Sequence, residues 1–236
     1  MCTVSFVNNN GAAIITSNRD EKVIRPAAIL PRNYIQNGKK IMYPKDSKEG
    51  GTWFAMDENG TVLVLLNGGI EKHNPISPYR KSRGLIVLDI MENDSPKDLW
   101  TQIDLDNIEP FTLVLYQQKN LYELIWDGLN RKTTKLDENQ NYIWSSVTLY
   151  PEEIRRERAN WFFDFLKDKN EITALDMLDF HKNTHKDDVQ NGLIINRENV
   201  MKTLSVTQVV TERNKGTMKY YDLVKTEDFS ASFIRI

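Results

Sequence analysis

The sequence lacks the features that mark several large classes of protein. It has one cysteine in 236 residues, so no disulfide can form within the chain, as is usual in a reducing compartment. No apolar run approaches the roughly 18 residues that a membrane-spanning helix needs. The N-terminus also lacks the basic-then-apolar pattern of a secretory signal. We therefore expect a cytoplasmic protein without a membrane span.

Neither sign of charge dominates. The chain has 31 Lys and Arg against 33 Asp and Glu, a formal net charge of −2, whereas nucleic-acid binding needs a clustered positive surface. The densest basic run, 155–158, follows two glutamates in a predicted helix, and we interpret it as a solvated helix face. Phosphate-loop and dinucleotide-binding signatures do not occur. We expect no nucleic-acid partner and no cofactor.

Strands and helices are both predicted, with no internal repeat or linker between them, so we expect one domain over residues 1–236. Four pairs of β-rich runs flank turn signals and predict hairpins over 2–17, 52–66, 111–126 and 205–223. Apolar periodicity and capping residues predict helices over 83–91, 95–103, 151–167 and 171–180. This pattern is typical of an α+β fold with mainly antiparallel sheets covered by helices.

The chemistry of the only cysteine, Cys2, depends on the initiator methionine. Removal of Met1 would leave a thiol and a free α-amine on one residue. An α-amine titrates near roughly 7.7–8.0 and a thiol near about 8.5, so the two groups form a nucleophile and its base. Alternatively, Cys2 is a small hydrophobic residue of the first strand. The residues alone leave both interpretations open.

Hairpin pairing brings a polar segment close to this thiol. A turn centred on Asn9-Asn10 would place Val4 opposite Ile15, and Cys2 opposite Ser17. One apolar face of the hairpin then carries Val4, Phe6, Ala13 and Ile15. The polar segment Asn18-Arg19-Asp20-Glu21 follows at once, within roughly 15 Å of the thiol.

In an extended strand, Arg19 and Glu21 share the face of Cys2, whereas Asn18 and Asp20 point the other way. A β-bulge would exchange these two sets. A guanidinium can lower the pKa of a thiol, and a carboxylate can orient an ammonium group, so either arrangement makes a candidate site. The other interpretation is an exposed charged turn at the end of a hairpin.

At these residues the sequence resembles the NRDE family, which includes the transport and Golgi organisation (TANGO) proteins. The matching residues, densest in roughly the first 90 positions, are Met1-Cys2, Asn18-Arg19-Asp20-Glu21, Arg25-Pro26, Gly50-Gly51-Thr52-Trp53, Asn67 and Ser82-Arg83-Gly84. The resemblance implies an N-terminal-nucleophile (Ntn) hydrolase-like fold. That fold is a four-layer αββα sandwich of two mainly antiparallel sheets between helical layers.

The resemblance also implies an activity. The start of the chain is similar to the choloylglycine-hydrolase and penicillin-acylase relatives, which hydrolyse amides with a cysteine at position 2. By this motif Cys2 would attack a linear amide and form a thioester, and Arg19 and Asp20 would hold its thiolate and α-amine. Asn67 would donate a hydrogen bond to the oxyanion. The residues expected to contact the substrate are Asn18, Glu21, Trp53, His73 and Ser146.

One position departs from the pattern of the relatives. Ser145-Ser146 stands where they carry a Ser-Asn pair, and the loss of an amide donor from an oxyanion hole can cost about 10²–10³ in rate. The alternative is a non-catalytic carrier of haem or a lipid-like ligand on the same scaffold. The expected partner is therefore a small-molecule amide or a hydrophobic ligand.

The histidines give weaker signals. His181 and His185 are spaced to share a helix face and could bind a metal, but no general base lies between them. We interpret them as solvated polar residues and predict no metal site. His73 follows Asn67 closely and is an acid–base group, a haem ligand or a loop residue.

Overall fold

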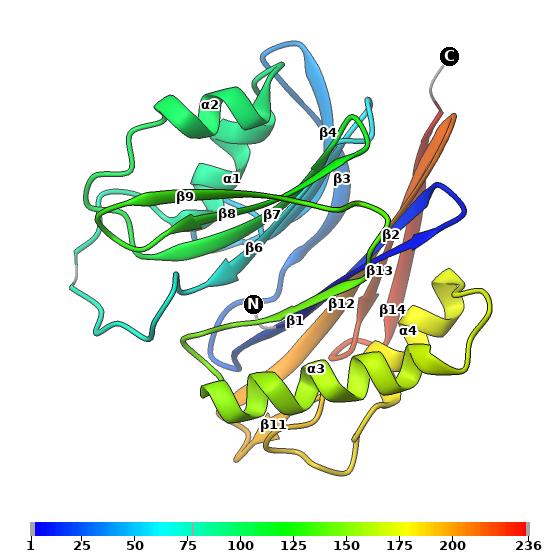
Figure 1. Ribbon diagram of the computed structural model, residues 1–236. Coiled ribbons are helices and arrows are strands. Elements are labelled where there is room, and N and C mark those ends of the chain that lie inside the picture. Colours follow the sequence, from blue (N-terminus) through cyan, green and yellow to red (C-terminus); the bar gives the residue numbers. More distant parts are fainter. Residues whose placement is uncertain (1–2, 77, 235–236) are drawn as a thin grey trace.

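Two antiparallel β-sheets stack face to face between two layers of helices in the computed structural model, which describes residues 3–76 and 78–234 (Figure 1). In spatial order, the first sheet contains β10 (Tyr142–Ser145), β1 (Thr3–Asn9), β2 (Ala12–Lys22), β12 (Met201–Glu212), β13 (Lys215–Asp222) and β14 (Glu227–Ile234), with β11 (Asn196–Arg197) also paired to β12. The second contains β3 (Ile29–Gln36), β4 (Lys39–Lys45), β5 (Phe54–Asp57), β6 (Val62–Asn67), β7 (Phe111–Gln117), β8 (Asn120–Trp126) and β9 (Arg131–Leu136).

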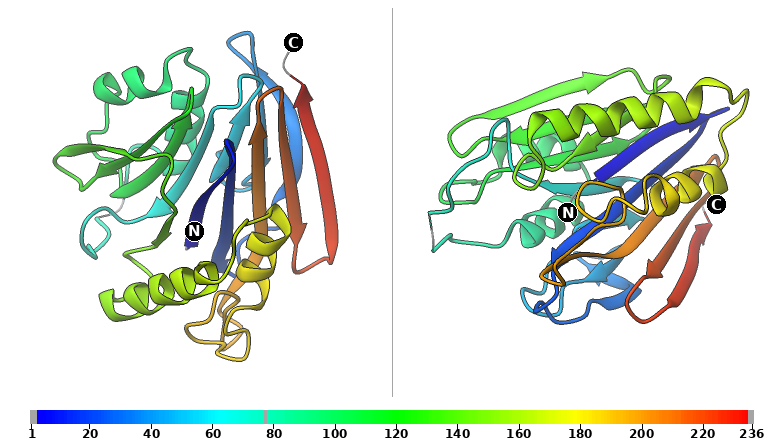
Figure 2. Two further views of the ribbon diagram at one scale, coloured as in Figure 1. Left: turned by 45° about the vertical axis from the view of Figure 1, so that its right-hand side comes forward. Right: turned by 90° about the horizontal axis from the view of Figure 1, so that it is seen from below.

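The helices cover the outer faces of the sheets. The second sheet carries α1 (Arg83–Met91) and α2 (Pro96–Gln102), and the first carries α3 (Glu152–Lys167) and α4 (Ala174–Asn183) (Figures 1 and 2). The expected αββα sandwich is therefore confirmed. No helix in the described part of the chain is both long and apolar enough to cross a membrane.

Two apolar cores hold the layers together. The larger core lies between the sheets and beneath α1 and α2, and it includes the predicted apolar face Val4, Phe6, Ala13 and Ile15. The smaller core joins the first sheet to α3 and α4 through Val7, Ile14, Phe162, Leu166, Met177, Phe180 and Leu193. Because Ile14 and Ile15 enter different cores, β2 is buried on both faces, and its side chains alternate between the two.

All four predicted hairpins and all four predicted helices occur, with boundaries shifted by a few residues. Pro151 is the N-cap of α3 rather than its first residue. Thr173 begins α4 with a capping box to Asp176. The β3–β4 hairpin was not predicted, although Asn37 and Gly38 form a strong turn signal and adopt φ angles of 50° and 80°.

The predicted register of the first hairpin is wrong by two residues. Thr3 pairs with Asn18, and Val4 pairs with Ser17 rather than with Ile15. The reason is that Asn10 and Gly11, with φ angles of 50° and 86°, form the turn. Since side chains alternate with a period of two, this shift leaves every residue on its predicted face.

Two side chains that were predicted to be solvated, those of Arg158 and His181, are buried in the structure. Arg158 is completely buried, and its guanidinium donates to Thr3 Oγ1 (2.6 Å) and to the carbonyl oxygens of Asn191 (3.0 Å) and Gly192 (2.6 Å). His181 is also completely buried, between α4 and the first sheet. In both cases a helix turns one polar residue toward the sheet, where specific hydrogen-bond partners satisfy it.

Candidate functional site

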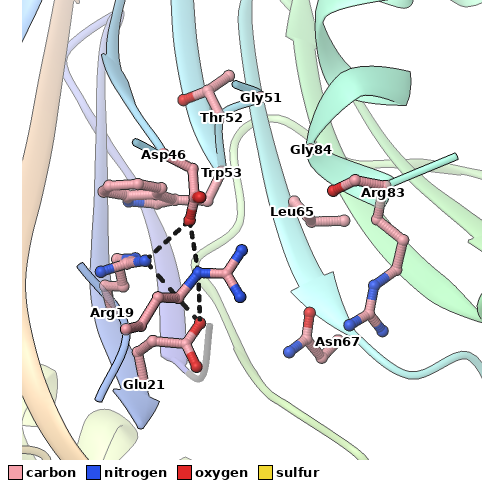
Figure 3. Close-up of a pocket in the computed structure, with 12 residues that line it drawn as sticks. Arg19, Glu21, Asp46, Gly51, Thr52, Trp53, Leu65, Asn67, Arg83 and Gly84 are labelled. Atoms are coloured by element: carbon pink, nitrogen blue, oxygen red, sulfur yellow. Dashed lines mark hydrogen bonds and ion pairs between the residues drawn. The ribbon is translucent and has the colours of Figure 1, made fainter. Parts of the chain in front are cut away.

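A polar pocket lies between the two sheets at the C-terminal end of β2. It has a volume of about 90 Å³, enough for roughly three water molecules. The charged and amide residues that line it are Arg19, Glu21, Arg25, Asp46, Asn67 and Arg83. Figure 3 shows Arg19, Glu21 and Asp46 across the pocket from Asn67 and Arg83. The pocket therefore brings together four of the predicted site residues: Arg19, Glu21, Trp53 and Asn67.

Asp46 is the centre of the charged network on one side of the pocket. Its Oδ2 accepts from Arg25 Nε (2.7 Å) and Arg19 Nη2 (3.1 Å), and Glu21 lies 3.7–3.8 Å from the same two nitrogens (Figure 3). Burial alone would raise the pKa of Asp46. The hydrogen bonds from Arg25 and the Glu49 backbone, together with the two arginine charges, outweigh burial and lower that pKa. Asp46 is thus an ionised anchor for both guanidinium groups.

Arg19 is held from a second direction by Trp53. Its guanidinium carbon lies 4.3 Å from the centroid of the Trp53 ring, and both side chains are buried. This cation–π contact and the bond to Asp46 fix the guanidinium at the pocket wall. A cation held in this way lowers the pKa of an acidic group placed beside it.

Close backbone packing forms the opposite wall. The Thr52 amide donates to the Gly84 carbonyl oxygen (3.0 Å), so the segment before β5 lies against the first turn of α1. The motifs Gly50–Trp53 and Ser82–Gly84 are therefore in contact. This contact places Arg83 at the pocket, where Glu109 pairs with it at 2.9 Å.

Asn67 and Ser146 are brought together at the end of β6. The buried Ser146 hydroxyl donates to the Asn67 carbonyl oxygen (2.9 Å) and lies 3.0 Å from Thr148 Oγ1. Asn67 also lines a second cavity, whose residues include Leu66 and Trp144. Ser146 thus contacts the backbone of Asn67, and Asn67 lies on the wall of both cavities.

Asp20 points to the other side of β2, as alternation along the strand predicts. Its carboxylate accepts from Tyr150 Oη (2.8 Å) and Thr203 Oγ1 (2.5 Å), and the residue is buried. The Arg158 guanidinium lies 3.6 Å from the Tyr150 ring centroid and donates to Thr3. Asp20 is therefore connected, through Tyr150 and Arg158, to the first described residue of β1.

Asn18 and His73 do not line the pocket. Asn18 Nδ2 donates to the carbonyl oxygens of His181 (3.1 Å) and Leu193 (2.6 Å), which ties β2 to the helical layer. His73 Nε2 lies 3.3 Å from Glu109, whose other oxygen pairs with Arg83. His73 is thus connected to the pocket wall through one intermediate side chain, that of Glu109, which pairs with the lining residue Arg83.

The interpretation of His181 as solvated is corrected by its contacts. Its Nε2 lies 2.7 Å from Ser5 Oγ, and its Nδ1 contacts Asn18 Oδ1. Burial, followed by the charge of Arg158, lowers the pKa of His181 to about 3, so the imidazole is neutral at physiological pH. No group of His, Cys, Asp and Glu suited to a metal ion occurs among the described residues.

Three charged residues of the pocket were not predicted as site residues: Arg25, Asp46 and Arg83. Arg25 and Arg83 belong to motifs that carry the family resemblance. The sequence therefore marked both residues but did not indicate what either does. Asp46 had no local signal, because its partners lie 21 and 27 positions away. Cys2 lies outside the described residues. Its chain neighbour Thr3 pairs with Asn18, the chain neighbour of Arg19.

Comparison with solved structures identifies the scaffold. The Caenorhabditis elegans N-acylethanolamine-hydrolyzing acid amidase (NAAA) ortholog matches with a TM-score of 0.62 at 13 % identity, over 88 % of this chain and 92 % of that chain. A variant of the conjugated bile acid hydrolase from Clostridium perfringens matches with a TM-score of 0.63 at 10 % identity, over 98 % and 92 % of the two chains. The chain therefore has an Ntn-hydrolase-like fold.

Comparison of sequences identifies the family. Curated proteins gave no significant match. The profile of the family described as Transport and Golgi organisation 2 (TANGO2) matches residues 1–233. This agrees with the resemblance drawn from the Asn18–Glu21 and Gly50–Trp53 motifs. Because the match spans nearly the whole sequence, the chain belongs to the TANGO2 family.

Proposed function

We propose that the protein is an N-terminal-nucleophile amidohydrolase, in which Cys2 attacks a linear carbon–nitrogen amide after Met1 has been removed. The observation that carries this proposal is the convergence of Arg19, Glu21 and Asn67 on one pocket, beside the strand that begins one residue after Cys2. The hydrolase-like scaffold also supports it, since both structures compared above bear the names of enzymes that cleave amides or bile acid conjugates.

The chemistry needs a base, a charge stabiliser and an oxyanion donor. The α-amine of Cys2 takes the thiol proton, and the thiolate attacks the amide carbon to form a tetrahedral oxyanion. As the carbon–nitrogen bond breaks, the ammonium returns the proton to the leaving amine, which leaves a thioester. Water, deprotonated by the same amine, then attacks the thioester and releases the carboxylic acid and the thiol.

The pocket residues take distinct roles in this proposal. Arg19, fixed by Asp46 and Trp53, stabilises the thiolate electrostatically. The amide of Asn67 donates to the developing oxyanion. Ser146 acts as a positioning residue, because its hydroxyl donates to the Asn67 carbonyl oxygen. Asp20 supports Thr3, the residue after Cys2, indirectly, through Tyr150 and the Arg158 guanidinium.

The first test is the intact mass of untagged protein, measured before and after brief treatment with iodoacetamide at neutral pH. We expect a mass without Met1 and rapid addition of one carbamidomethyl group, because the chain has a single cysteine. The second test screens simple N-acyl amides with wild type and Cys2→Ala, and we expect turnover by wild type alone. Retention of Met1 with slow labelling, or equal turnover by both proteins, would refute the proposal.

A carrier function is the second candidate, favoured by the cavity next to Asn67. Its volume of about 310 Å³ lies within the range of small-molecule sites, and several walls are apolar. A haem titration followed at the Soret band, and native mass spectrometry for a co-purified lipid, test this candidate. It is rejected if the spectrum stays that of free haem and no ligand is found.

A further inference from the structure

The cavity beside Asn67 combines apolar walls with cations that no described carboxylate neutralises. It lies among β6, β8, β10 and the start of α3, and its apolar walls are formed by Leu66, Ile125, Ile143, Trp144 and Val147. Its cationic residues are Lys132 and Arg155. Because Asn67 lines both this cavity and the polar pocket, a molecule bound at Asn67 can extend into either.

Arg155 is the most informative of these residues. The side chain is half-buried, and its Nε is fully buried without a hydrogen-bond partner in the described part of the chain. Among the described residues no carboxylate lies within ion-pair distance of its guanidinium, and Glu152 is paired with Arg156 instead (2.7 Å). A buried donor without an acceptor is costly, so this guanidinium is suited to an acceptor supplied from outside.

The other charges around the cavity do not compensate Arg155. Glu123, the only carboxylate among the described residues that line the cavity, accepts from Trp144 Nε1 (2.9 Å). Lys132 forms no ion pair with the described carboxylates and is exposed at the rim. Arg155 also borders an adjoining cavity of about 730 Å³, where Glu71 and Glu152 lie on the wall. The cavity beside Asn67 is therefore lined by one carboxylate and two cations.

We propose that Arg155 binds an anionic group at the far end of an apolar substrate segment, so that the substrate class is linear amides with a terminal carboxylate. This inference rests on the proposed function, because it takes the amide to lie at Asn67. The apolar walls contact the hydrocarbon segment, and the planar guanidinium forms paired hydrogen bonds with the carboxylate. An uncharged end group would leave the Arg155 donor unpaired and bind more weakly.

The experiment measures binding without chemistry. Isothermal titration calorimetry on Cys2→Ala protein compares N-acetyl-8-aminooctanoate with N-acetyl-octylamine, which has the same amide and a similar chain but no carboxylate. We expect the carboxylate ligand to bind at least about tenfold more tightly, as a charge-assisted pair predicts. In the Cys2→Ala background, Arg155→Gln should abolish that preference and Arg155→Lys should retain part of it.

Arg156→Gln is the matched control, because Arg156 is the exposed chain neighbour and already pairs with Glu152. It should leave both affinities unchanged. Equal binding of the two ligands, no binding of either, or an unchanged preference in Arg155→Gln would overturn the inference. Hydrolysis by wild type of both ligands at the same rate would keep the proposed function and reject this substrate class. Selective binding of the carboxylate ligand without any hydrolysis by wild type would support the anion site at Arg155 and reject the proposed function.

Discussion

Gly51 and Gly84 pack so closely that neither position has room for a side chain. A β-carbon on Gly51 would lie 2.3 Å from the Gly84 carbonyl carbon, and one on Gly84 would lie 2.9 Å from the Thr52 carbonyl oxygen. The contact joins the segment before β5 to the start of α1. It thereby links Trp53, on which Arg19 stacks, to Arg83 on the opposite wall of the pocket.

Gly51→Ala should lower the free energy of unfolding by about 2 kcal/mol or more, because two backbone segments must separate to admit the methyl group. Urea unfolding measures the effect. Lys48→Ala in the same loop is the control, because Lys48 is exposed and pairs only loosely with the exposed Glu49 (3.6 Å), so its loss should change the unfolding free energy by less than about 0.5 kcal/mol. Equal stability of Gly51→Ala and wild type would show that this contact is easily rearranged.

Two adjacent lysines on β4 should differ sharply in their response to removal of their charge. Lys39 Nζ is buried, 2.8 Å from Asp57 Oδ2, and donates to the carbonyl oxygens of Met91 and Asn93. Lys39→Met leaves the Asp57 charge buried and should cost about 3–5 kcal/mol of unfolding free energy. Lys40→Met removes only an exposed pair with Glu58 (3.8 Å) and should change it by less than about 0.5 kcal/mol. Similar losses in both variants would contradict the importance of burial here.

His181 should make the protein sensitive to moderate acid. Burial lowers the pKa of His181 to about 3, whereas an unfolded histidine titrates near 6.5. Below pH 6.5 the unfolded state therefore binds a proton that the folded state does not. The stability contribution is complete above that pH and falls by up to about 1.4 kcal/mol per pH unit toward pH 3.

Urea unfolding at pH 7.5 and 5.5 measures this dependence. His181→Gln should reduce the difference between the two pH values even if it lowers stability at both. His185→Gln should preserve the difference, since His185 is exposed just beyond α4, where it stacks on Trp161. A His181→Gln protein with the full pH dependence would assign it to other groups.

Arg19→Gln should raise the pKa of the Cys2 thiol under the proposed function, because the thiolate loses the cation that is proposed to stabilise it. The rate of iodoacetamide labelling, followed by mass spectrometry from pH 5 to 10, should shift its midpoint upward by about 1 unit. Arg32→Gln, a change at an exposed residue of β3, should leave the profile unchanged. An unshifted midpoint in Arg19→Gln would remove Arg19 from the proposed mechanism.

Local patterns in the sequence predicted the elements, but not every partner. The hairpins and helices follow from apolar periodicity and turn residues, which act over a few positions. The register error at the first hairpin arose because Asn8-Asn9-Asn10-Gly11 permits more than one turn, and only the structure selects Asn10 and Gly11. The faces of β2 were nevertheless correct, since the error was an even number of residues.

Long-range partners account for what the sequence did not reveal. Arg158 and His181 look like exposed helix residues, and they are buried because hydrogen-bond partners from distant segments reach them. The anchoring role of Asp46 depends on two arginines from β2 and the loop that follows it. Such contacts are set by how the layers stack, which periodicity along one strand does not describe.

Because Asn18, Arg19, Asp20 and Glu21 alternate between the two faces of β2, the site depends on the number of residues in β2 as well as on which residues these four are. Arg19 and Glu21 enter the pocket, while Asn18 binds the carbonyl oxygens of His181 and Leu193 in the helical layer. Asp20, on the same side as Asn18, binds Tyr150 and Thr203. One inserted or deleted residue in β2 before Asn18 would turn all four side chains over, putting the anchors in the pocket and the arginine against Tyr150 and Thr203. A single substitution here removes the contacts of one side chain. The insertion or deletion of one residue would instead disrupt both the pocket and the contacts on the other face of β2.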